Sequence, residues 1–517
     1  MKRTILSIAM ALAMIAGVAG AQDFIVNNGS EPQSFDPSLI QGVPEHRIYL
    51  ALFEGLVVND PKTSKAVPGV AESWVVSPDG LKITFKLRKC TWSDGAAITA
   101  KDFVDGWLRT LDPATASEYA YMIGTVVKGA DEYNKGKGPR EGVGIKAVGD
   151  LVFEVSLKGP TAYAVDMMSH YAFAPLPMHA LAKYGAEWIR PGKFVGNGPF
   201  TLKEWRPQEY VLVERNPKYW DAKSVKLKTI KFLPIEDTRT AYNMFKNKEI
   251  DWATTVPNDL IDEVKLRKDY QVGPQFSTYY MLYNVTRKPL DDVRVRKALA
   301  MAIDKKGLVE KITKGGQLVA DTVIPPNAGY VSPKGAGYNP EEAKKLLAAA
   351  GYPDGKGFPP MTVIYNTSDN HKKIMEYVQA EWKKNLGIEF ALRNLEWTTF
   401  LDTRSNLHDF DITRAGWIAD YVDPSTFLDM FLTGGGNNDG LYSNAKYDAL
   451  CAQAVTMKAG AERLKVMAQA EEIFITQDQG MIPLYFYVAQ DLIDTSLWGG
   501  WFNNPLGSHP WKYIYKK

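Results

Sequence analysis

The chain has 517 residues, of which 45% are hydrophobic and 12% aromatic, so a packed interior is expected. Its 61 basic and 59 acidic residues nearly balance, which argues against nucleic acid or an anionic membrane as the main partner. Such a length predicts more than one domain, because single hydrophobic cores rarely grow beyond about 250–300 residues.

The N-terminus has the pattern of a secretory signal peptide. Lys2 and Arg3 precede an apolar run over 5–21 that ends in Ala19-Gly20-Ala21. We predict cleavage after residue 21 and export to the periplasm, with an uncleaved membrane anchor as the alternative. No cysteine lies near the site, and no later apolar run approaches the ~20 residues of a spanning helix.

Short strands and helical stretches alternate along the first half of the chain, which predicts an α/β fold. Residues 82–88 alternate between polar and apolar, and they follow the turn Pro78-Asp79-Gly80, so a hairpin is expected there. Thr99 is suited to cap a helix. The other elements predicted in this half are strands over 23–27 and 151–157 and a helix over 46–56.

The second half predicts a helix over 292–304 with a basic face whose charges we expect to be solvated. Residues 361–365, 372–384 and 388–393 have the pattern of a strand, a helix and a strand, as in a βαβ unit. A helix over 462–475 and a strand over 482–488 follow.

One segment, 413–424, carries opposite charges on either side of an apolar centre. Arg414 and Asp420 flank Trp417, and residues of equal parity share a face if the segment is extended. The two would then lie about 20 Å apart along the backbone at about 3.3 Å per residue. This arrangement suits a ligand with opposite charges at its ends, such as a short peptide. A core strand with solvated charges at its ends fits the spacing equally well.

Enzyme signatures are absent from the sequence. It contains no H-E-x-x-H, G-x-S-x-G, Walker loop or C-x-x-C, and its six histidines form no close metal-like pair. We therefore expect neither catalysis nor a cofactor or metal, with a secreted hydrolase as the less favoured alternative. Cys90 and Cys451 could form a disulfide after export or remain buried thiols.

Several motifs together resemble the bacterial periplasmic oligopeptide-binding proteins of extracellular solute-binding protein family 5, the receptors of peptide ABC importers. These motifs are Arg414-Ala415-Gly416-Trp417, Ala419-Asp420-Tyr421, Asp423-Pro424-Ser425-Thr426-Phe427-Leu428, Asn197-Gly198-Pro199-Phe200 and Glu214-Arg215-Asn216-Pro217-Lys218-Tyr219-Trp220-Asp221. The resemblance extends along nearly the whole chain after the leader. It implies a monomeric two-lobed periplasmic binding protein (type II-like) with an extra inserted domain.

The resemblance also implies the division of the chain and its partners. Lobe one would comprise 22–53, 178–276 and 490–517, the inserted domain 54–177, and lobe two 277–489, with hinge crossovers near 276 and 489. The expected partners are short oligopeptides and the permease and ATPase subunits of a transporter. Ser277 and Ile418 occupy the positions of a disulfide found in some relatives, so that bond is not expected here.

A set of ligand-binding residues follows from the same resemblance. Asp420 is expected to pair with the α-ammonium of the ligand, and Arg414, Arg404 or His371 with its C-terminal carboxylate, depending on peptide length. Main-chain groups around Gly416 and Ile418 would add the ligand as a strand. The side chains expected to line the pocket are Tyr119, Trp397 and Trp417.

Two positions depart from the family pattern. Gln41 replaces an acidic residue near the pocket entrance, and Thr313, beside Lys314, replaces a lysine that can meet a tripeptide carboxylate. We therefore expect preferences for peptide charge and length to differ from those of better-known relatives. Dipeptides, murein peptides and nickel chelates remain alternative ligands.

Overall fold

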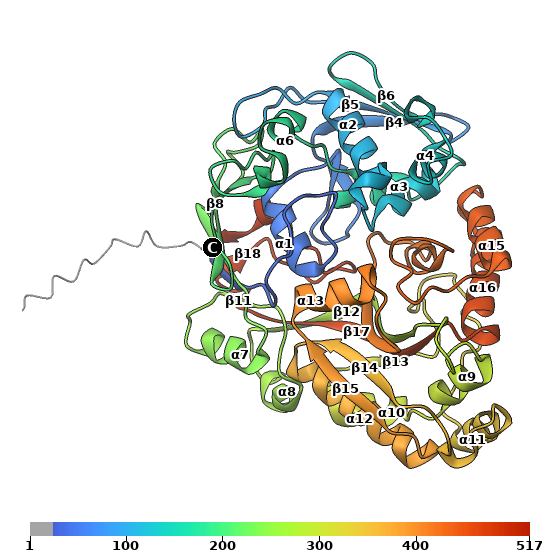
Figure 1. Cartoon of the computed structure of the whole chain (residues 1–517). Coiled ribbons are helices and arrows are strands. Elements are labelled where there is room, and N and C mark those ends of the chain that lie inside the picture. The colour runs from blue at the N-terminus through green and yellow to red at the C-terminus, as the bar shows by residue number, and fades with distance from the viewer. Residues whose placement is uncertain (1–23) are drawn as a thin grey trace, which may run out of the picture.

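A computed structural model describes residues 24–517 of the chain. The predicted signal peptide and its cleavage after Ala21 lie outside the described residues. Within residues 24–517, no helix combines the length and apolarity needed to cross a membrane. Figure 1 shows a mixed α/β molecule whose elements gather above and below a central region.

The central feature is an 11-stranded sheet in the order β15-β14-β16-β12-β17-β11-β1-β10-β9-β8, with β13 paired to β17. Its strands are β1 (Phe24–Asn27), β8 (Phe200–Arg206), β9 (Tyr210–Arg215), β10 (Thr229–Leu233), β11 (Trp252–Ala253), β12 (Tyr270–Tyr283), β13 (Leu318–Val319), β14 (Met361–Asn366), β15 (Phe390–Leu395), β16 (Ile412–Ile418) and β17 (Met481–Ile493). The order places β16, which contains the first part of the charged segment, third from the β15 end of the sheet.

Two long antiparallel strands, β12 and β17, join the two ends of this sheet. Strand β12 pairs with β16 on one side, whereas the far end of β17 pairs with β11. The β12–β17 register shifts between Pro274 and Thr278, so the pairing is irregular there. This irregularity lies beside the crossover expected near 276. The division into lobes at residues 276 and 489 remains a prediction.

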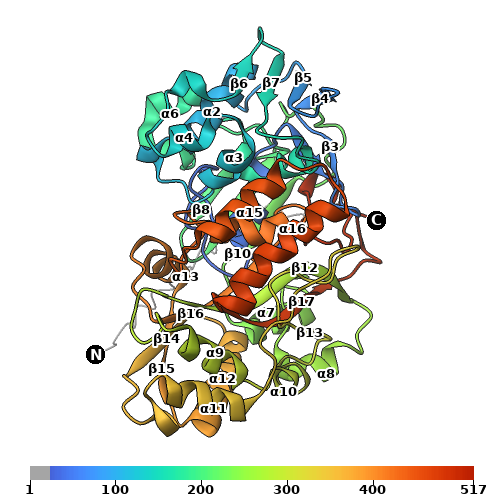
Figure 2. The same cartoon turned by 90° about the vertical axis from the view of Figure 1, so that its right-hand side faces the viewer.

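Helices lie both above and below the large sheet (Figures 1 and 2). They include α1 (Val43–Leu52), α2 (Ala100–Leu111), α3 (Ala120–Val126), α4 (Ala130–Asn134), α6 (Met178–Tyr184), α7 (Thr238–Lys246), α9 (Val293–Met301), α11 (Pro340–Ala349), α12 (Asp369–Leu386), α15 (Ala445–Val455) and α16 (Ala461–Glu471). The helix predicted over 46–56 is α1, which begins earlier because Pro44 is tolerated in a first helical turn.

The inserted region contains a separate four-stranded sheet, at the top of Figure 1. Its order is β4-β5-β7-β6, formed by β4 (Ala71–Val76), β5 (Lys82–Leu87), β6 (Ile145–Ala147) and β7 (Val152–Ser156). The predicted hairpin is confirmed, because β4 and β5 pair antiparallel across the turn. Thr99 is the N-cap residue of α2, as predicted, and its N–H donates to Oδ2 of Asp102 at 2.7 Å.

The predicted βαβ unit is confirmed. Strands β14 and β15 pair in parallel and are joined by α12. Of these two strands, only β14 also pairs with β16, and it does so only through Val363 and Ile364. The side of β16 that faces β14 is therefore covered only at its beginning.

The prediction for the basic helix over 292–304, α9, was partly wrong. Arg296 is buried, and its guanidinium donates to the carbonyl oxygens of Leu290 at 2.7 Å and Asp478 at 2.5 Å. A buried Arg is acceptable when its planar donors meet several acceptors. Sequence periodicity could not reveal these acceptors, which come from other segments.

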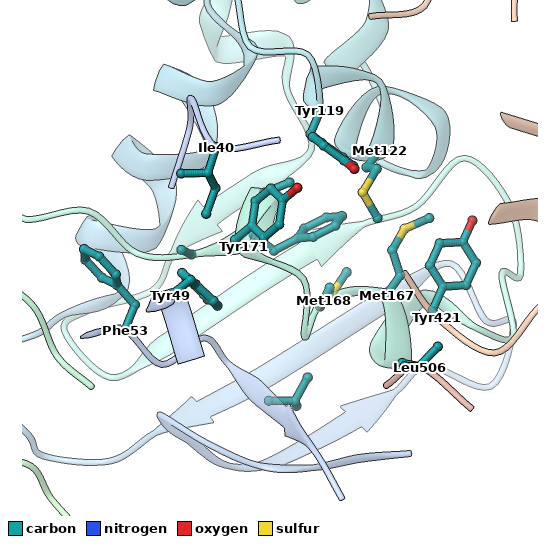
Figure 3. Close-up of a cluster of buried hydrophobic side chains, with 14 of the residues drawn as sticks. Ile40, Tyr49, Phe53, Tyr119, Met122, Met167, Met168, Tyr171, Tyr421 and Leu506 are labelled. Atoms are coloured by element: carbon teal, nitrogen blue, oxygen red, sulfur yellow. The ribbon is translucent and has the colours of Figure 1, made fainter. Parts of the chain in front are cut away.

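The largest core joins the inserted region to both the start and the end of the chain. Figure 3 shows Met167 and Met168 near Tyr421, the residue that follows Asp420, and near Leu506. The ring of Tyr421 also stacks on that of Tyr163, with centroids 5.0 Å apart. Both cysteines of the chain, Cys90 and Cys451, are free thiols, which settles the alternative in favour of no disulfide.

Candidate functional site

A cavity of about 470 Å³ opens beside the free part of β16. Its walls include the inserted region, the β12–β17 pair and the segment after β16. All ten residues expected from the sequence to bind ligand line it: Gln41, Tyr119, His371, Trp397, Arg404, Arg414, Gly416, Trp417, Ile418 and Asp420.

Strand β16 alternates between core and cavity. Thr413, Ala415 and Trp417 are buried, whereas the even-numbered positions 414, 416 and 418 are half-buried. Because side chains alternate across a strand, the even-numbered positions share one face. Arg414 and Asp420 thus border the same cavity, and the strand itself is confirmed.

One edge of β16 lacks a partner strand. Residues 412–418 pair with β12 on one side, but on the other side β14 pairs only with Ile412 and Thr413. Within residues 24–517, no strand pairs with the remaining edge over 414–418. Main-chain donors and acceptors there are available to an added extended chain.

Asp420 lies at one end of this free edge with part of its carboxylate unused. Its Oδ2 is buried and has no hydrogen-bond partner among the described residues. Burial raises the pKa of Asp420 well above its usual 3.8, because the charged form loses its hydration. A cationic group of a ligand would supply the missing partner and favour the ionised form.

His170 contacts the other oxygen of Asp420 and was missed by the sequence reasoning. Nε2 of His170 lies 3.4 Å from Oδ1 of Asp420, while Nδ1 accepts the Ala172 N–H at 3.3 Å. Because Nδ1 accepts this hydrogen bond, the hydrogen of a neutral ring must be on Nε2, which faces the carboxylate. Burial lowers the pKa of His170 well below 6.5, so the ring is neutral at pH 7.

Aromatic rings enclose the same corner of the cavity. The ring centroid of Tyr119 lies 4.6 Å from that of His170 and 6.2 Å from that of Trp417. Trp417 is anchored by its Nε1–H, which donates to Thr426 at 3.2 Å. Water therefore reaches Asp420 mainly through the cavity.

Arg414 lies at the other end of the free edge of β16. Its Nη1 donates to Asn366 and its Nη2 to the hydroxyl of Tyr487, both at 3.0 Å, and its guanidinium lies 4.8 Å from the ring centroid of Tyr279. Its Nε is buried without an acceptor among residues 24–517. These contacts hold the cation in place and leave one donor unsatisfied.

His371 and Arg404 also border the cavity but have protein partners. Nδ1 of His371 lies 3.1 Å from the hydroxyl of Tyr279, and burial lowers the pKa of His371 well below 6.5. Nε of Arg404 donates to Asp439 at 2.8 Å in a largely buried ion pair. A ligand carboxylate at Arg404 would have to share that cation with Asp439.

The positions that depart from the family pattern lie at the rim or wall of the cavity. Thr313 and Gln41 both line it, and Thr313 donates to the side chain of Gln317 at 2.9 Å. Lys314 pairs with Asp262 at 3.3 Å and does not line the cavity. Behind Gln41, the buried Glu45 accepts the indole N–H of Trp397 at 3.3 Å.

Comparison with known proteins places the chain in a family. The sequence model of "Bacterial extracellular solute-binding proteins, family 5 Middle" matches residues 65–439. The chain is 38% identical over 525 residues to the periplasmic oligopeptide-binding protein OppA of Escherichia coli K12, a match that covers 98% of this chain and 95% of OppA. The chain belongs to family 5 of the solute-binding proteins.

Two solved structures show which arrangement this family 5 protein adopts. It matches Haemophilus influenzae OppA in complex with RPPGFSPFR with a TM-score of 0.91, at 34% identity, covering 95% of this chain and 98% of that one. With the unliganded open form of the murein tripeptide-binding protein MppA, the TM-score is 0.62 at 32% identity, covering 96% and 98%. The structure therefore has the arrangement of the peptide complex rather than the open one.

Proposed function

We propose that this family 5 protein is a periplasmic receptor that binds short peptides in extended form and delivers them to the permease of an ABC transporter. The main support is the free edge of β16, bounded by one carboxylate oxygen and one guanidinium nitrogen that are both buried and have no partner among residues 24–517. The α-ammonium of a peptide would meet Asp420, and its carboxylate Arg414 or His371.

The names of the relatives support this proposal. The E. coli and H. influenzae relatives are oligopeptide-binding proteins, and the latter was solved with a nine-residue peptide. A receptor of this kind gains affinity from main-chain hydrogen bonds, which do not depend on peptide sequence. Dipeptides and murein peptides would use the same two charges, whereas a nickel chelate leaves the free strand edge unexplained.

Calorimetry with one tripeptide in three forms tests the proposal. The protein is first unfolded, dialysed and refolded to remove endogenous ligand. Tri-alanine should bind, whereas N-acetyl-tri-alanine and tri-alanine amide should each bind at least tenfold more weakly, because each leaves a buried charge unpaired. Equal binding of all three forms would contradict recognition of the termini.

The same samples separate a receptor from the alternative of a secreted hydrolase. A receptor returns its ligand unchanged, so mass spectrometry after prolonged incubation should find intact tri-alanine. Conversion to alanine and dialanine by purified protein, at a rate proportional to protein concentration, would support the hydrolase.

A further inference from the structure

A second cavity of about 780 Å³ lies between the inserted region and the α15 side of the molecule. Helices α3 and α4 border it on one side, and α15 with the loop over 432–443 on the other. Figure 2 shows α15 directly below α3. We call this cavity the α3–α15 chamber; its volume is within the range of about 300–1,000 Å³ typical of small-molecule sites.

The chamber is distinct from the peptide cavity, although they share a thin wall. None of the ten residues expected to bind peptide lines the chamber. Sequence neighbours face opposite sides of the wall: Glu118 lines the chamber and Tyr119 the peptide cavity, while Ser405 lines the chamber and Arg404 the peptide cavity. A ligand in the chamber would therefore lie one residue away from the peptide site.

One part of the chamber wall is apolar. Gly434 has open space where a side chain would stand, whereas Gly436 packs closely against the backbone of Glu118. The apolar and aromatic side chains that line the chamber are Ala120, Tyr121, Leu432, Tyr442, Cys451 and Val455. A hydrophobic body of moderate size would bury its surface against them.

The polar part of the wall contains more carboxyl groups than amines. Four carboxyl groups line the chamber, against two lysines: Glu118, Asp131, Asp429, Asp448, Lys135 and Lys158. Lys135 is already paired with Asp131 at 2.9 Å. Asp448 accepts the Thr433 N–H at 3.1 Å, and Asp429 accepts a hydrogen bond from the hydroxyl of Tyr421 at 3.4 Å.

Glu118 is the carboxyl group of the chamber that lacks a hydrogen-bonding or ionic partner among the described residues. Among residues 24–517 its side chain accepts no hydrogen bond and forms no ion pair, although it is half-buried. Burial, assisted by the nearby charge of Asp439 and opposed by that of Arg404, raises the pKa of Glu118 to about 8. An ammonium group placed beside it would supply both a donor and a compensating charge.

We propose that the α3–α15 chamber binds a small molecule with an apolar body and one primary ammonium group, the ammonium lying against Glu118. One wall comes from the inserted region and the other from the part of the chain expected to form lobe two, so occupation of the chamber should favour the arrangement in which the two are in contact. Binding in the chamber and binding of peptide should then strengthen each other by equal factors. This coupling depends on the proposed peptide function; binding of the amine does not.

Tryptamine is a suitable probe, with indole-3-propionate as the matched anion. Calorimetry is performed on protein saturated with tri-alanine, so that Asp420 is occupied and cannot capture the amine. We expect one tryptamine per chain and at least tenfold weaker binding of indole-3-propionate. Failure of tryptamine to bind, or equal binding of the anion, would overturn the proposal.

Two pairs of variants locate the probe. Ala452→Trp should fill the chamber and abolish tryptamine binding, whereas Gln453→Trp, on the next and also exposed residue of α15, lies outside it. Glu118→Gln should weaken tryptamine at least tenfold, whereas Glu132→Gln on α4 should not. Tryptamine binding unaffected by both Ala452→Trp and Glu118→Gln would place it elsewhere and reject the chamber.

The coupling is measured as the change in tri-alanine affinity at saturating tryptamine. We expect a gain of about threefold or more in the parent and in Gln453→Trp, and none in Ala452→Trp. No gain in the parent would reject the coupling. If tri-alanine itself fails to bind, the peptide function fails, and comparison of tryptamine binding to peptide-free parent and Ala452→Trp still decides whether the chamber is a site.

Discussion

At the scale of single residues, Asp420 and Arg414 have hydrogen-bonding capacity that the protein itself does not use. Each has a buried atom without a partner, Oδ2 in one and Nε in the other. Such atoms are costly to leave unpaired, since burial removes their water. Arg404 differs, because Asp439 already satisfies it. We therefore expect Asp420 and Arg414 to contribute more to binding than Arg404.

Asp420→Ala should weaken di-, tri- and tetrapeptides alike, because every unmodified peptide has an α-ammonium. Removal of one partner of a buried ion pair typically costs ~3–5 kcal/mol, which is roughly two to three and a half orders of magnitude in affinity. Calorimetry measures the loss. His371→Ala should affect only some peptide lengths.

The exposed Asp402, which does not line the cavity, provides a control. Asp402→Ala should leave all affinities unchanged. If Asp420→Ala binds a free-amine tripeptide within a factor of about three of the parent, the ammonium must be held elsewhere.

Peptide binding should release protons through Asp420. In the ligand-free enclosed arrangement of this structure, burial raises the pKa of Asp420 above 3.8, and an adjacent ammonium should lower it again. Between the lower bound-state pKa and the raised free-state pKa, binding expels a proton, so affinity should increase with pH across that window.

Calorimetry in buffers of different ionisation enthalpy counts the protons. Tri-alanine amide isolates Asp420, because without a carboxylate it cannot raise the pKa of His371 and cause proton uptake. The release should vanish in Asp420→Asn. An equal release from that variant would assign the proton to another group.

At the scale of elements, the free edge of β16 matters more than any single side chain. Successive main-chain groups of a strand point to opposite sides, so an added peptide can pair with β16 through only every second residue. Gly416 leaves space beside the strand. A Cβ at this position would lie 2.5 Å from the hydroxyl oxygen of Tyr487 and would displace Tyr487, which accepts a hydrogen bond from Arg414. A side chain at position 416 would therefore disturb both strand and cation.

A scan of N-methylated tetra-alanines should show a period of two. Methylation removes the N–H donor, so it should weaken binding strongly where that N–H faces β16 and only slightly at the intervening position. A lost hydrogen bond that leaves a buried acceptor costs about 1–3 kcal/mol, or roughly five- to 150-fold. Titration calorimetry gives the pattern. Uniform effects at all amides would argue against strand addition.

At the scale of the whole molecule, β12 and β17 connect the regions that enclose the ligand. The β12–β17 register shifts between Pro274 and Thr278 and again between Tyr279 and Tyr280, so the ladder is locally disrupted close to the crossover expected near 276. Remote contacts also hold the enclosed arrangement, including the parallel stack of Tyr163 on Tyr421. If the protein closes over a peptide as proposed, we expect the equilibrium between open and closed forms to depend also on residues that the peptide does not touch.

Small-angle scattering should show compaction when stripped protein binds tri-alanine, because hinge closure brings the two regions together. Tyr163→Ala removes an aromatic pair worth about 0.5–1.5 kcal/mol. It should therefore weaken peptide binding by up to roughly tenfold. Tyr184→Ala is the control, because Tyr184 neither lines the peptide cavity nor stacks on Tyr421. An unchanged radius of gyration in the stripped parent would exclude closure.

Local patterns in the sequence were sufficient to predict several helices and strands and the opposite charges that flank Trp417. The hairpin at 78–80, the cap at Thr99 and the βαβ unit over 361–393 depend on turn chemistry and periodicity between near neighbours. The common face of Arg414 and Asp420 likewise follows from the period of a strand. The assignment of their roles came from resemblance, since a core strand would have had the same spacing.

Only the tertiary structure decided which of these groups lack partners. His170 reaches Asp420, and Tyr487 reaches Arg414, from segments far away in the chain. The burial of Arg296 by distant carbonyl oxygens has the same origin. The free edge of β16 exists because β14 stops pairing after two residues. Such contacts depend on how distant segments pack, and no local pattern of residues encodes them.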